Sequence, residues 1–209
     1  MPLQNRVTPY GEIIATPGRG TMFGNRGGRF HDPTTRSLLR RRFASRRWIC
    51  CELRFKNRSR AVFGQGYTEL FFLDEATALA AGHRPCFECR RADALRFRAA
   101  FARGNGLAAP PLADEMDARL HAERLGPHPR IADWRSLPEG AMFGDGRAAL
   151  LMVGGLLLRW GVDGYREERD GALAEVVELQ LLTPPSIVAA LRAGYAPRLH
   201  STATAFARS

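Results

Sequence analysis

The four cysteines fall into two short groups, and their spacing constrains the fold more than any other feature of the chain. Cys50 and Cys51 are adjacent within an apolar stretch, whereas Cys86 and Cys89 form a C-x-x-C pair. A C-x-x-C turn can place two thiolates on one zinc ion, with backbone N–H groups stabilising the sulfur charge. Four cysteines in 209 residues are too few for a disulfide scaffold, so they indicate a metal site or a reactive thiol.

Only one of the two adjacent cysteines is expected to meet the C-x-x-C pair. Residues 48–55 (WICCELRF) are typical of a β-strand, in which neighbouring side chains point to opposite faces. The predicted metal ligands are Cys51, Cys86, Cys89 and, with distortion of the strand, Cys50. The other sources of a fourth ligand are His31, His83 or water, although His83 is interpreted first as a packed core histidine.

The remaining pattern predicts an α+β protein. Its first part would be a small α/β module of the zinc type, and its second part a β-rich domain with a terminal helix. We predict a module at 1–103, a Gly/Pro/Ala-rich and acidic linker at 104–118, and the β-rich domain at 119–209. The entry at 8–35 is turn-rich. Strands are expected at 48–55, 67–73, 148–153, 156–160 and 175–182, and helices at 75–81, 92–103, 113–125 and 183–194. Asp74 and Thr183 are the predicted caps of the first and last of these helices, and Gly154-Gly155 predicts a hairpin turn.

Positive charge is concentrated in the first half. Residues 1–103 hold 20 Arg and Lys against 8 Asp and Glu, whereas residues 104–209 hold 11 against 13. This asymmetry predicts a polyanionic partner, of which duplex DNA is the natural candidate, and arginine suits bidentate phosphate contacts. The candidate nucleic-acid-binding residues are Arg26, Arg29, Arg40, Arg41, Arg42, Arg46, Arg47, Arg84 and Arg90.

Residues 71–90 (FFLDEATALAAGHRPCFECR) resemble the second half of the Ada N-terminal metal-binding domain. That family has an apolar strand, a short alanine-rich helix and then an R-P-C-x-x-C-R segment, and the likeness extends loosely over residues 45–103. The resemblance implies structural zinc and a cysteine that accepts a methyl group from a methyl phosphotriester in alkylated DNA. The family's upstream C-x-x-x-C pair is replaced here by the adjacent Cys50 and Cys51.

A hydrolytic site is the other chemical prediction. His31 and Asp32 are adjacent in a loop rich in glycine and arginine, where a phosphate can approach the backbone closely. With Glu69, they are the candidate catalytic residues of a nuclease, His31 as general base or ligand and Asp32 as its orienting partner. Mg²⁺ is the second candidate cofactor, because carboxylates can hold it at such a site.

These features together predict a DNA-repair protein that recognises alkylated DNA and cleaves it as an endonuclease. The alternatives are a non-enzymatic, zinc-containing sensor of alkylation and a methyl-phosphotriester methyl acceptor. The longest apolar run, 148–158, has 11 residues, short of the roughly 20 that span a bilayer. With no apolar signal core at the N-terminus, a cytoplasmic protein with no membrane partner is expected.

Overall fold

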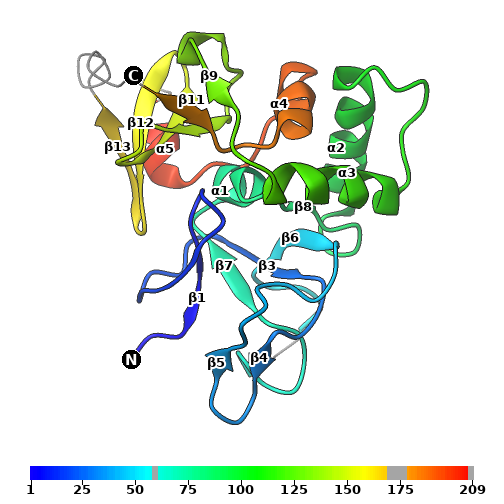
Figure 1. Cartoon of the computed structure of the whole chain (residues 1–209), viewed down its shortest axis with the longest axis vertical. Helices are drawn as coiled ribbons and strands as arrows, with labels where there is room; N and C mark the ends of the chain where they lie inside the picture. Colours follow the sequence, from blue (N-terminus) through cyan, green and yellow to red (C-terminus); the bar gives the residue numbers. More distant parts are fainter. Residues whose placement is uncertain (58–60, 169–177, 207–209) are drawn as a thin grey trace.

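The computed structural model describes residues 1–209 except 58–60, 169–177 and 207–209, and it has the α+β architecture that the sequence predicts. Two six-stranded sheets lie at opposite ends of the molecule, with helices packed between and beside them (Figure 1). No helix within the described residues is long and apolar enough to cross a membrane.

The first sheet has the strand order β2-β1-β7-β3-β6-β8. Its strands are β1 (Gln4–Val7), β2 (Ile13–Ala15), β3 (Met22–Arg26), β6 (Trp48–Glu52), β7 (Leu70–Phe72) and β8 (Arg84–Pro85). Alternate residues of its central strands, such as Met22, Cys50 and Leu70, enter one hydrophobic cluster. A separate hairpin pairs β4 (His31–Asp32) with β5 (Ser37–Leu38).

Strand β3 corrects the expectation that residues 8–35 are mainly turns. It lies between β7 and β6 at the centre of the sheet and pairs antiparallel with both. A turn-rich segment places Gly24 in a loop, but the close packing of β3 against β6 requires a glycine there. A Cβ at this position would lie 2.2 Å from the carbonyl oxygen of Ile49.

The second sheet has the order β13-β12-β11-β10-β14-β9. Its strands are β9 (Arg130–Ile131), β10 (Met142–Gly144), β11 (Ala149–Val153), β12 (Leu156–Gly161), β13 (Gly164–Glu168) and β14 (Leu179–Leu181). Gly154 and Gly155 form the predicted hairpin turn, both with positive φ. The strand predicted at 175–182 lies partly outside the described residues, and its described part is β14.

The helices are α1 (Glu75–Ala80), α2 (Arg91–Gly104), α3 (Ala113–Leu125), α4 (Pro185–Arg192) and α5 (Ser201–Phe206), with a 3₁₀ turn, η1 (Trp134–Ser136). Asp74 caps α1 as predicted, accepting a hydrogen bond from the backbone N–H of Thr77 at 2.9 Å. Thr183, predicted to cap α4, instead accepts from the backbone N–H of Met142 at 2.9 Å.

One hydrophobic cluster joins the two halves of the chain. Phe97 and Phe101 of α2 share it with Phe143, Leu150 and Leu191 of the second half. The segment predicted as a linker contains the last residue of α2 and the first turns of α3.

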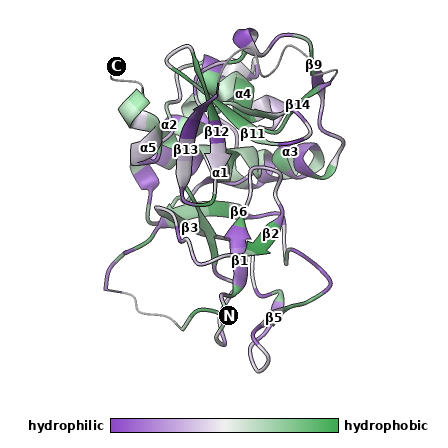
Figure 2. Cartoon of the chain, turned by 90° about the vertical axis from the view of Figure 1, so that its left-hand side faces the viewer, coloured by the Kyte–Doolittle hydropathy of each residue, from purple (hydrophilic) through white to green (hydrophobic). Residues whose placement is uncertain are grey.

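Figure 2 shows the hydrophobic stretches on β6 and β11 and the hydrophilic stretch on β1.

Candidate metal centre and adjoining pocket

Three of the four cysteines form a cluster at the edge of the first sheet. Cys51 is on β6, Cys86 directly follows β8, and Cys89 lies in the turn before α2. Their sulfur atoms all lie within 4.8 Å of one another. The parallel pairing of β6 with β8 brings the two segments together, and the backbone N–H of Cys86 donates to the Cys50 carbonyl at 2.9 Å.

The backbone around the cluster stabilises sulfur charge. The N–H of Glu88 points at Cys86 Sγ and the N–H of Glu52 at Cys89 Sγ, each at 3.4 Å. Hydrogen bonds from Cys51 and Cys89 lower the pKa of Cys86, whereas its sulfur neighbours and burial raise the pKa of Cys51. Zinc is commonly bound by cysteine sulfur, and backbone N–H groups that point at the sulfurs stabilise their negative charge. Three such sulfurs close together therefore fit zinc well. Cys51, Cys86 and Cys89 would therefore hold the ion.

Cys50 is placed away from this cluster. Its side chain is fully buried on the opposite face of β6, where Arg90 Nη1 lies 3.5 Å from its sulfur. Burial raises the pKa of this thiol. Alternation along a strand separates the adjacent cysteines, so the prediction that the strand distorts to make Cys50 a fourth ligand is wrong. Within the described residues, the cluster contains no fourth His, Cys, Asp or Glu.

A cavity of about 500 Å³ opens beside the three sulfurs. It lies on the face of the sheet that carries Phe23 and Phe71, and the loop between β6 and β7 contributes Phe55 and Tyr67. All three cluster cysteines line it, and the positively charged Arg19 and Arg54 lie at its wall. Glu52, Glu69 and Glu88 line it as well, so the pocket combines cysteine sulfurs, aromatic rings and charges of both signs. The sequence pattern does not indicate Phe23 as a pocket residue, because residues 8–35 are expected to be mainly turns, and it places Phe71 on a strand without indicating the pocket.

His31 is buried and both of its ring nitrogens have partners. Nδ1 lies 2.8 Å from Thr68 Oγ1, Nε2 lies 2.8 Å from the Gly64 carbonyl, and the ring stacks on Phe63 at 4.6 Å. Glu69 accepts a hydrogen bond from the backbone N–H of Phe63 at 2.8 Å. These contacts hold Phe63 in a backbone conformation with a φ of +57°. They therefore also fix the loop that carries Phe63 and borders the pocket.

The three predicted catalytic residues do not converge on one point. Asp32 turns back to accept hydrogen bonds from the backbone N–H groups of Thr34 and Thr35, and these hydrogen bonds lower its pKa. Of the three residues, Glu69 lines the pocket beside the cysteines. His83, the other histidine considered as a ligand, packs its buried ring against Trp48 and Phe72, as expected.

Three of the nine candidate nucleic-acid-binding arginines are buried and engaged within the protein. Arg26 stacks on Trp48, Arg84 forms a bidentate ion pair with Asp117, and Arg90 binds Glu75. The other six are exposed and cluster around β4, β5 and the loop that follows. They are Arg29, Arg40, Arg41, Arg42, Arg46 and Arg47.

Contacts connect this basic region to the border of the pocket. Arg29 donates to the carbonyl of Gln65 at 3.2 Å, and Arg36 donates to that of Val62 at 3.2 Å.

Comparisons with family models, curated proteins and solved structures return no match. The likeness to the Ada N-terminal domain therefore stays a prediction, and the functional argument rests on the geometry of this chain.

Proposed function

We propose that this protein is a DNA-repair protein in which a zinc–thiolate centre accepts an alkyl group from alkylated DNA. The observation that carries the proposal is the opening of Cys51, Cys86 and Cys89 onto a cavity of about 500 Å³, with no fourth side-chain ligand in the described part of the cluster. A purely structural zinc site is normally closed by four protein ligands. An open thiolate cluster beside a pocket is suited to chemistry at sulfur.

The transfer is a direct displacement. The lone pair of a thiolate sulfur forms a bond to the methyl carbon of a methyl phosphotriester, and the carbon–oxygen bond breaks. Its electron pair leaves on the phosphate oxygen, so the triester becomes a diester anion and the sulfur a neutral thioether. Cys51, Cys86 and Cys89 would hold a zinc ion, which would keep their thiols deprotonated at neutral pH. Cys89, which is more exposed than Cys51 and Cys86, is the proposed acceptor.

Methyl acceptance is favoured over endonuclease activity by the composition of the pocket. Three sulfur atoms and four aromatic rings line it, whereas of the predicted nuclease residues Glu69 alone lines it, and His31 and Asp32 are engaged elsewhere. The exposed arginines around β4 and β5 supply the proposed DNA surface. Phosphate contacts of this kind give affinity without sequence preference.

We expect incubation with methylated duplex DNA to add the mass of one methyl group to the peptide that contains Cys89. Intact-mass and peptide mass spectrometry would measure this transfer. The Cys50→Ser variant should accept the group as the wild type does, because Cys50 lies outside the pocket. Nicking of methylated plasmid without protein methylation would contradict the proposal and return the protein to the endonuclease class.

We expect exposed arginines of the first half to dominate the salt dependence of DNA binding. Replacing Arg40 and Arg46 with alanine should weaken binding and reduce the slope of log K against log salt by up to about 2, because each lost phosphate contact removes about 0.9. Fluorescence anisotropy with a labelled duplex at several salt concentrations would measure it. The matched control is Arg147→Ala with Arg166→Ala, two exposed arginines of the second half. Equal losses in the two double variants would contradict a localised surface.

A further inference from the structure

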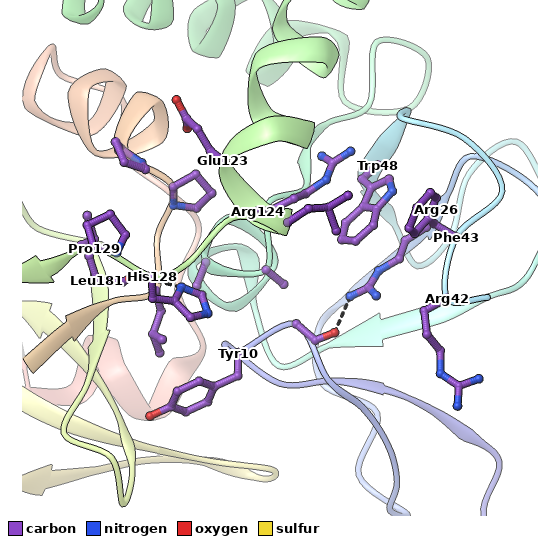
Figure 3. Close-up of a pocket in the computed structure, with 17 residues that line it drawn as sticks. Tyr10, Arg26, Arg42, Phe43, Trp48, Glu123, Arg124, His128, Pro129 and Leu181 are labelled. Carbon is purple, nitrogen blue, oxygen red and sulfur yellow. Dashed lines mark hydrogen bonds between the residues drawn. The ribbon is translucent and has the colours of Figure 1, made fainter. Parts of the chain in front are cut away.

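A second cavity, of about 180 Å³, lies where the first half of the chain meets the second (Figure 3). Its wall includes Arg26 and Trp48 from the first sheet, Arg124 from the end of α3, and His128 from the segment that follows. It shares no lining residue with the pocket at the cysteine cluster. The proposed alkyl transfer makes no use of it.

The indole of Trp48 lies between two guanidinium groups. The Cζ atoms of Arg26 and Arg124 each lie 4.0 Å from the ring centroid, and Figure 3 shows the ring between them. Arg26 is 2% exposed. Stacking on tryptophan stabilises each cation. The two positive charges nevertheless repel each other, because both lie beside the same ring and water screens them poorly there.

No carboxylate in the described residues forms an ion pair with either cation. Arg26 donates to the Gly11 carbonyl at 2.7 Å and to His83 Nε2 at 3.4 Å, so its partners are neutral. His83 itself stays neutral, because burial and the two arginines lower its pKa. Burial, followed by the charge of Arg124, lowers the pKa of Arg26 to about 9, which leaves it charged at neutral pH.

Arg124 is held in the same way. It donates to the Gly82 and Arg46 carbonyls at 2.8 and 2.7 Å, and its Nε is buried with no hydrogen-bond partner among the described residues. Asp117 is the carboxylate that offsets its charge, but Arg84 already binds both oxygens of Asp117. The wall of the cavity therefore carries positive charge that the protein does not neutralise.

The rest of the lining completes a site for an anion with a flat apolar group. Arg42 lines the cavity with a third, exposed guanidinium that donates to the Leu39 carbonyl, while Tyr10 and Phe43 add aromatic surface. The acid in the wall, Glu123, accepts hydrogen bonds from the backbone N–H and hydroxyl of Ser186. Glu123 points away from the arginines in Figure 3.

We propose that this cavity binds the phosphate group of a small phosphate monoester with an aromatic portion, of which a nucleoside monophosphate is the natural class. The phosphate would lie against Arg26 and Arg42, where it offsets the uncompensated charge. Arginine forms bidentate, charge-assisted hydrogen bonds with phosphate, and the aromatic rings would pack against the base. The same phosphate chemistry could come from free inorganic phosphate, so the test includes both.

Isothermal titration calorimetry of the full chain with AMP, inorganic phosphate and adenosine would test the proposal. We expect AMP to bind more tightly than phosphate and adenosine to give no measurable heat. Arg42→Ala should weaken AMP binding by about tenfold or more, because a charge-assisted hydrogen bond is lost. Arg40→Ala, in the same exposed loop but outside the cavity, should bind AMP as the wild type does.

Three results would overturn the proposal. The first is no heat with either AMP or phosphate. The second is AMP binding no more tightly than phosphate, which removes the aromatic part of the site. The third is the same weakening in Arg40→Ala and Arg42→Ala, which indicates general surface charge. Because Arg42 is exposed, its variant should fold normally even if replacement of the buried Arg26 prevents folding.

Discussion

Replacing Cys86 with serine should release about one zinc ion per chain and unfold the region around β6, β8 and the start of α2. Three cysteine sulfurs that could hold a metal ion converge here from two chain segments, so losing one would leave an incomplete site. Structural zinc contributes on the order of 10 kcal/mol in small modules, and therefore the loss should exceed that of any other single substitution considered for this protein. Elemental analysis and thermal denaturation would measure the two effects.

Cys50→Ser is the matched control for that experiment. It changes a cysteine next to Cys51, but the side chain lies on the other face of the strand, beside Arg90. The variant should retain its zinc, and its stability should fall by no more than the usual cost of a small core change. If Cys50→Ser loses zinc to the same extent as Cys86→Ser, the three-sulfur centre is incorrect. The three-sulfur centre would also be contradicted if the wild-type protein contained no zinc and Cys86→Ser melted at the same temperature as the wild type.

Replacing Glu75 with alanine should destabilise the protein by about 2–3 kcal/mol, because buried donors lose their acceptor while Arg90 keeps its ion pair with Asp93 at 2.8 Å. Glu75 is 1% exposed and lies at the start of α1. Its carboxylate accepts hydrogen bonds from Arg90 at 2.7 Å, from the backbone N–H of Arg198 at 2.8 Å and from the hydroxyl of Tyr195. It therefore ties the segment after α4 to the segment that carries the cysteine pair.

The comparison variant is Glu167→Ala, which removes an exposed carboxylate from β13 and should change the free energy of unfolding by less than about 0.5 kcal/mol. Urea denaturation followed by circular dichroism would measure both. Arg90 is also 3.5 Å from Cys50, so Glu75→Ala should perturb the interior beside β6 as well. Similar stability of the two variants would contradict the role of Glu75 in joining the halves.

Local pattern was sufficient for several features of the candidate metal centre. The period-2 alternation of a strand determines that Cys50 and Cys51 face apart, and a C-x-x-C turn brings Cys86 and Cys89 together. Asp74 before an alanine-rich stretch predicted the helix cap, and Gly154-Gly155 predicted the hairpin. Each of these depends on residues a few positions apart, where backbone geometry alone decides the outcome.

The tertiary structure decided which charged and aromatic residues are available for function. Arg26, Arg84 and Arg90 look like the exposed arginines in sequence, but contacts with residues far along the chain bury them: Trp48, Asp117 and Glu75. The pocket beside the cysteines depends on β3, and Gly24 on this strand is explained by the close approach of Ile49 and Phe72. Local sequence encodes the direction of a side chain relative to its own strand or helix. The partner that it meets is determined by how distant segments pack, which local periodicity does not specify.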